Sequence, residues 1–170
     1  MSANFGHVHR VQDKGKLAFA GHLVRRFVGF VTAAPLTPSE QQLIAGALEP
    51  ALRRAFFSQR SADQRHAFDV WQRVDGDLDL AAPALLHDIG KVASDLGALS
   101  RSTATVLHSL RLPVTRRWRR YLAHGEIGAD RLEELGASDL AVHFARNHPS
   151  GPPTGVNPEF WCRLERADEI

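Results

Sequence analysis

The sequence predicts an all-α fold, a compact globule of several helices. Helix-capping signals recur along the chain, apolar residues between them follow helical spacing, and alternating strand patterns are nearly absent. With 170 residues, of which 44% are hydrophobic and 24% charged, the chain is large enough to bury a core of its own. No internal repeat interrupts this pattern, so one architecture is expected throughout.

Residues 1–59 are predicted to form a helical extension that packs on the rest of the chain. Segment 16–32 combines apolar side chains with three basic ones, which favours an amphipathic helix across the core. Contact of this segment with a membrane surface is the alternative. Thr37 to Glu40 combines a capping threonine, a first-turn proline and a glutamate in the third position, which predicts one helix from there to about Phe57.

The later helices are predicted from similar start and stop signals. Ser61 to Gln64 resembles a second capping box, and the helix that it opens is expected to end at about Val74, before Asp75-Gly76-Asp77. Pro83 suits the first turn of a short buried helix over 82–89, with Gly90 closing it. Four more helices are expected over residues 98–110, 124–135, 138–147 and 157–168, with a break at Pro113 between the first two.

Composition limits the classes of partner and location. The net charge is only +2, and the arginines clustered around Trp118 and Tyr121 are interpreted as a solvated helical face, so no stable nucleic-acid partner is predicted. The single cysteine, Cys162, excludes an internal disulfide framework and a thiolate metal site. The N-terminus has no signal-peptide pattern and no apolar stretch approaches the ~20 residues that span a bilayer, which predicts a cytoplasmic location.

The adjacent pair His87 and Asp88 is the strongest candidate for a metal anchor. It follows an apolar run and combines a borderline nitrogen ligand with a hard carboxylate. Leaving that aspartate unpaired in apolar surroundings would be costly, and a metal removes the cost. Neighbouring helical residues point about 100° apart, so other segments must supply more ligands. The candidates, each on its own segment, are His66, His124, His148 and Asp168.

Five segments resemble the HD superfamily of metal-dependent phosphohydrolases. The three with the stronger resemblance are Arg65 to Val70, Ala84 to Val92 and Arg166 to Asp168; the other two, His124 to Ala129 and Asn147 to Gly151, resemble the further histidine segments of its small binuclear bacterial branch. The resemblance covers residues 60–170, which are therefore expected to form an HD-type hydrolase domain. The cyclic-dinucleotide phosphodiesterase branch is disfavoured, because its consecutive histidines and its glycine-tyrosine-proline signature are missing.

This resemblance implies a role for each candidate residue. A first divalent metal would be bound by His66, His87, Asp88 and Asp168, and Asp88 would bridge to a second one held by His124 and His148. Asp88 and Lys91 would be the catalytic residues, with Lys91 facing a phosphate of the substrate. One or two ions of Fe, Mn, Mg, Zn, Ni or Co are expected, two being favoured. They would activate a hydroxide that hydrolyses a phosphate ester or anhydride, with a nucleotide as the favoured substrate.

Two other functions share these residues. The same ligand set occurs in mixed-valent di-iron oxygenases of the superfamily, and the ligands cannot distinguish the two reactions. Lys91 favours phosphohydrolysis, although oxygenases also bind anionic substrates. A non-catalytic HD-type signalling or adaptor domain is the third class, and the six filled ligand positions argue against it.

Overall fold

A computed structural model describes residues 33–94, 115–148 and 150–169, and all regular structure in these ranges is helical. This confirms the predicted all-α class. The elements are α2 (Pro38–Ala47), α3 (Pro50–Phe57), α4 (Ser61–Arg73), α5 (Ala81–Leu86), the 3₁₀ helix η1 (Ile89–Ser94), α7 (Arg116–Leu122), α8 (His124–Glu134), α9 (Asp139–Asn147) and α10 (Pro158–Asp168). The helices expected over 16–32 and 98–110 and the break at Pro113 lie outside the described residues, as do the side chains of Arg117, Trp118 and Arg120.

The prediction of one helix from Pro38 to Phe57 is wrong, because the chain forms α2 and α3 there. Pro50 cannot continue a helix, since it lacks an N–H and its ring clashes with the preceding turn. The residue before it, Glu49, is accordingly extended, with φ −56° and ψ 151°. The capping box at the start of α2 is confirmed: Glu40 N donates to Thr37 Oγ1 at 3.3 Å, and Thr37 N donates to Glu40 Oε2 at 2.7 Å.

Helix α4 has the predicted length but begins differently. Ser61 is its first helical residue, and the N-cap residue, Arg60, makes no side-chain capping bond, so the second capping box is wrong. The predicted termination is confirmed, because Asp75 and Gly76 both adopt left-handed backbone with φ 63° and 64°. That conformation turns the chain back toward α5.

The structure also corrects the prediction that Gly90 closes a helix over 82–89. Helix α5 ends at Leu86, His87 and Asp88 occupy a turn, and the chain then continues through Gly90 as η1. Lys91 N donates to Asp88 O at 2.9 Å, the three-residue separation of a tighter 3₁₀ turn.

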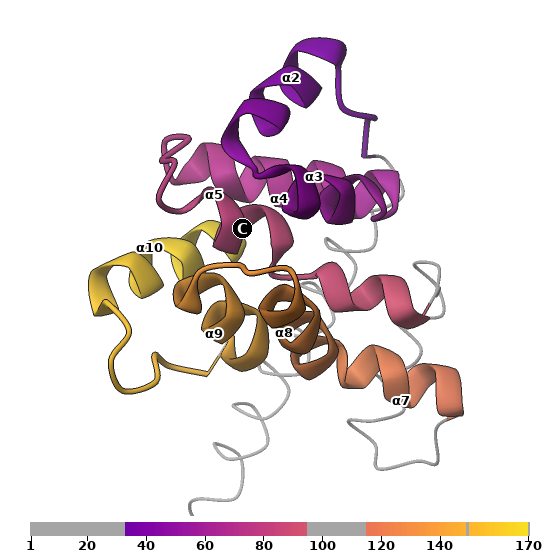
Figure 1. Ribbon diagram of the computed structural model, residues 1–170, viewed down its shortest axis with the longest axis vertical. Helices are drawn as coiled ribbons and strands as arrows, with labels where there is room; N and C mark the ends of the chain where they lie inside the picture. Colours follow the sequence, from indigo (N-terminus) through magenta and orange to yellow (C-terminus); the bar gives the residue numbers. More distant parts are fainter. Residues whose placement is uncertain (1–32, 95–114, 149, 170) are drawn as a thin grey trace, which may run out of the picture.

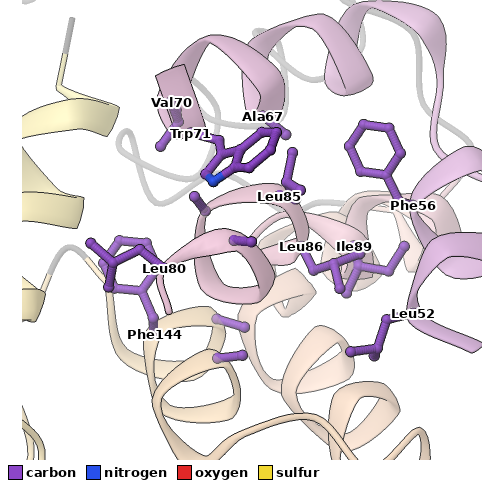
Figure 2. Close-up of a cluster of buried hydrophobic side chains, with 14 of the residues drawn as sticks. Leu52, Phe56, Ala67, Val70, Trp71, Leu80, Leu85, Leu86, Ile89 and Phe144 are labelled. Carbon is purple, nitrogen blue, oxygen red and sulfur yellow. The ribbon is translucent and has the colours of Figure 1, made fainter. Parts of the chain in front are cut away.

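Helix α5 is the centre of the core. Figure 1 shows α4 on one side of it and α8 with α9 on the other, and α4, α9 and α3 all contact it. Figure 2 shows buried side chains from three helices around α5: Ala67, Val70 and Trp71 of α4, Leu52 and Phe56 of α3, and Phe144 of α9, which lies beside Leu80. Because the His87-Asp88 turn follows α5 directly, it enters the middle of the molecule.

The C-terminal helices agree with their predicted positions. Gly136 ends α8 with φ 71°, and Ser138 caps α9 by accepting from Ala141 N at 3.4 Å. Asn157 caps α10 by accepting from Glu159 N at 2.9 Å. Their boundaries follow from local capping signals, which is why the sequence predicts them well.

The N-terminal elements belong to the same core as the others. Leu52 and Phe56 of α3 are buried in one hydrophobic cluster with α4 and α5, and Gln59 Nε2 donates to Leu85 O at 3.2 Å. The domain boundary expected at residue 59 stays a prediction. None of the helices in the described ranges has the length and apolar character needed to cross a membrane.

Candidate metal centre

The structure brings all six candidate ligands together. They come from five parts of the fold: His66 from α4, His87 and Asp88 from the turn after α5, His124 from the first residue of α8, His148 from the end of α9 and Asp168 from the end of α10. Within two groups, ligand atoms lie within 4.8 Å of one another: His66 with His87 and Asp88, and His87 with His148 and Asp168. The side chains of His87 and Asp88 are 0% and 3% exposed, so the cluster begins inside the core.

Asp168 faces three histidines. Its Oδ1 lies 2.8 Å from His66 Nε2 and 3.4 Å from His87 Nε2, while its Oδ2 lies 3.4 Å from His148 Nε2. Arg73 Nη1 donates to Ala167 O at 3.0 Å, which joins the end of α10 to α4, the helix that carries His66.

The two carboxylate oxygens of Asp88 have different neighbours. Its Oδ2 lies 3.4 Å from His87 Nε2 and accepts a hydrogen bond from Lys91 Nζ, whereas its Oδ1 lies 3.4 Å from His124 Nε2. His124 is in neither of the two compact groups. His148 lies beside Asp168 and His87. The resemblance to the HD superfamily implies a different place for it, beside His124 at a second metal.

Three of the histidines share one orientation. The Nδ1 atoms of His87, His124 and His148 lie 2.9, 2.7 and 3.2 Å from the backbone carbonyl oxygens of Ala84, Tyr121 and Phe144. A carbonyl only accepts, so each Nδ1 carries a proton, and in a neutral ring Nε2 presents a lone pair. Metal-binding histidines are commonly held by such a bond from their other ring nitrogen.

Of these three histidines, His87 is the one whose side chain is fully buried. Its Nε2 is buried and has no hydrogen-bond partner. Burial lowers the pKa of this imidazole, but the negative charges of Asp88 and Asp168 outweigh that effect and raise the pKa to about 10. The site therefore attracts a cation to this nitrogen, either a proton or a metal ion.

Both carboxylates are ionised. Burial would raise the pKa of each, yet Lys91 and His87 hold the pKa of Asp88 well below its usual range, and His87 and His148 do the same for Asp168. Lys91, itself buried, compensates one of the two negative charges. Four imidazoles and two carboxylates, with a lysine beside them, form a donor set that suits a divalent transition metal.

Aromatic rings support two of the histidines. Phe144 stacks on His148 with ring centroids 5.0 Å apart, and Tyr121 stacks on His124 at 5.5 Å. The sequence interpretation missed both residues. Each lies three or four positions before its histidine, the spacing of one helical turn, and that spacing could have identified them.

The chain matches no family model, no curated protein and no solved structure.

Proposed function

We propose that this chain is a metal-dependent phosphohydrolase of the HD superfamily, acting on a phosphate ester or anhydride, with a nucleotide as the favoured substrate. One observation carries the proposal: His87, His124 and His148 are held through Nδ1 and turn Nε2 toward Asp88 or Asp168. In a neutral ring that nitrogen presents a lone pair to the carboxylate, and either a proton or a metal ion between them removes the repulsion. A bond from Nδ1 to a carbonyl is the kind that commonly orients metal-binding histidines, and it is this feature that supports metal ligation.

The residues present fit a metal of moderate softness. His66, His87, Asp88 and Asp168 would hold the first ion, and nitrogen-rich ligation favours Fe, Mn, Zn, Ni or Co over Mg. Two ions remain the favoured number, because Asp88 presents one oxygen to His87 and the other to His124. His148 lies beside Asp168 and His87, so it is also available to the first ion.

Hydrolysis needs an activated water and compensation of phosphate charge. A bound divalent metal lowers the pKa of its water from about 15.7 toward ~7 and stabilises the charge that develops in phosphoryl transfer. Lys91 would supply a further positive charge to a phosphate oxygen, since its ammonium group already lies at Asp88. We propose a phosphorylated small molecule as the substrate, a cytoplasmic location for the chain, and no stable nucleic-acid partner.

Metal analysis of the protein purified without oxygen, followed by a panel of nucleotides and phosphoesters, tests this function. We expect one or two transition-metal ions per chain and release of phosphate or of a nucleoside monophosphate. Only trace metal would overturn the proposal. Bound iron with oxygen consumption and no phosphate release would favour the di-iron oxygenase instead.

Asp88→Asn is the most informative single substitution, because Asp88 faces both His87 and His124. We expect metal content and turnover to fall together, with the chain still folded. Asp130→Asn is a matched control, since the Asp130 side chain is 71% exposed and its ion pair with Arg146 is worth about 0–1 kcal/mol. Unchanged biological activity in a folded His87→Ala, Asp88→Ala double variant would favour the adaptor function.

A further inference from the structure

Gly90 and Gly128 let η1 and α8 meet backbone to backbone beside the metal centre. A β-carbon on Gly90 would lie 1.9 Å from His124 O and 2.7 Å from Gly128 N. A β-carbon on Gly128 would lie 3.0 Å from Gly90 N. These neighbours are backbone atoms, so no rotamer change can move them away. The observed separation of the two elements therefore requires glycine at position 90, whereas a β-carbon at position 128 would require its neighbours to give by a few tenths of an ångström.

A third glycine makes a similar contact on another side of α8. A β-carbon on Gly125 would lie 2.8 Å from Ala145 O and 3.3 Å from Arg146 O, both in α9. At these three glycines, α8 meets the backbone of η1, which follows Asp88, and the backbone of α9, which ends beside His148.

We propose that Gly90, Gly125 and Gly128 are positioning residues that hold His124 against Asp88. The inference rests on the proposed metal function. His124 is the first residue of α8, and its Nε2 reaches Asp88 Oδ1 at 3.4 Å. The other ligands come from α4, the turn after α5, α9 and α10. A shift of α8 relative to η1 consequently moves His124 away from the cluster and leaves His66, His87 and Asp168 in place.

Metal ligation tolerates only displacements of a ligand that are much smaller than the size of a methyl group. Metal–ligand distances in proteins stay within about 0.2 Å of their ideal values. Alanine at Gly128 would force α8 or η1 to give way by a few tenths of an ångström, because the contact with Gly90 N is already at 3.0 Å. That displacement is enough to weaken ligation by His124 without unfolding the helix, in which alanine is intrinsically favoured.

A double-mutant cycle between Gly128→Ala and His124→Ala tests positioning, with Co²⁺ as the probe. In the full chain we expect Gly128→Ala to lower Co²⁺ affinity about tenfold, the effect typical of losing support for a ligand. In the His124→Ala background the same change should cost less than about twofold, because no ligand remains to be displaced. The visible Co²⁺ bands of Gly128→Ala should also shift toward those of His124→Ala.

The outcomes separate this inference from the proposed function. An equal loss of Co²⁺ affinity in both backgrounds, or no loss in the chain that retains His124, overturns the positioning role. Failure of the unaltered chain to bind Co²⁺ overturns the metal function itself. If Gly128→Ala does not fold, Gly125→Ala takes its place in the cycle. Gly46→Ala is the matched control, because a β-carbon there meets nothing within 4 Å and should leave Co²⁺ affinity unchanged.

Discussion

The α4–α10 side of the cluster and the η1–α8 side are joined by different kinds of contact. Between α4 and α10, arginine side chains reach backbone carbonyls: Arg73 donates to Ala167 O at 3.0 Å, and Arg163 Nη2 donates to Val74 O at 3.2 Å. Between η1 and α8, the backbones meet at Gly90. A long side chain can adjust when its partner moves, whereas touching backbones cannot. The η1–α8 side should therefore tolerate far less change.

Gly90→Ala is expected to have the largest effect on folding. Its β-carbon would lie 1.9 Å from His124 O, so η1 and α8 must separate. Overpacking typically costs about 1–3 kcal/mol and more where backbone has to move, so we expect a loss of about 3 kcal/mol or more in the free energy of unfolding. Denaturant unfolding measures this loss. A cost below about 1 kcal/mol would show that the two elements part easily and would remove the contrast between the two sides.

Arg73→Met should have a smaller effect, because it removes one hydrogen bond between α4 and α10 and forces no backbone apart. We expect the free energy of unfolding to fall by about 1 kcal/mol, the usual net value of one such hydrogen bond. Arg131→Met is the control, since Arg131 pairs only at the surface with Glu134, where the two side chains are 56% and 65% exposed. If Arg73→Met costs as much as Gly90→Ala, the arginine contact is as unyielding as the glycine contact.

The sequence predicts which residues gather at the candidate site better than it predicts how they are held in place. Caps at Ser138 and Asn157 act within a few residues, so the bounds of α9 and α10 could be inferred locally. Local signals place Gly90 at a helix end, whereas its actual constraint comes from His124 O, far along the chain. The position of His148 beside Asp168 is equally non-local. Pro50 is a visible local signal, but the apolar period runs through it and by itself predicts one helix where the chain forms two.

Gly46→Ala should change stability in the opposite direction to Gly90→Ala. Gly46 lies within α2, and a β-carbon there meets nothing within 4 Å. Alanine is favoured over glycine in a helix by about 0.5–1 kcal/mol, so the free energy of unfolding should rise by that amount. Thermal and denaturant unfolding both report it. A destabilised Gly46→Ala would mean that loss of glycine itself, rather than a backbone contact, explains the effect at Gly90.

The smallest expected effect concerns a third arginine contact, between Arg65 and Glu40. Arg65 donates to Glu40 Oε1 at 2.8 Å and to Oε2 at 2.7 Å, and these bonds, together with the one from Thr37 N, lower the pKa of Glu40 from 4.5 to about 2. The folded pKa lies below the unfolded one, so this stabilisation is present above pH 4.5 and is lost as the pH falls toward about 2.

Glu40→Gln tests this pH dependence. The stability difference between the original chain and Glu40→Gln should shrink on acidification within that window, as followed by unfolding midpoints at a series of pH values. A difference that stays constant through the window would show that the ion pair contributes nothing.

The hydrogen bond between His66 and Asp168 joins residues 102 positions apart. Helices that are adjacent in the sequence, such as α4 and α5 or α8 and α9, are joined by short loops. The contact between His66 and Asp168 instead closes a long loop, and the entropy lost in closing it must be overcome before the contacts form. We therefore expect α10 to dock last when the chain folds, with burial of Trp161 as the fluorescent signal. During translation, the six candidate residues cannot assemble until α10 has left the ribosome, so a metal bound by all of them would be acquired only after that point.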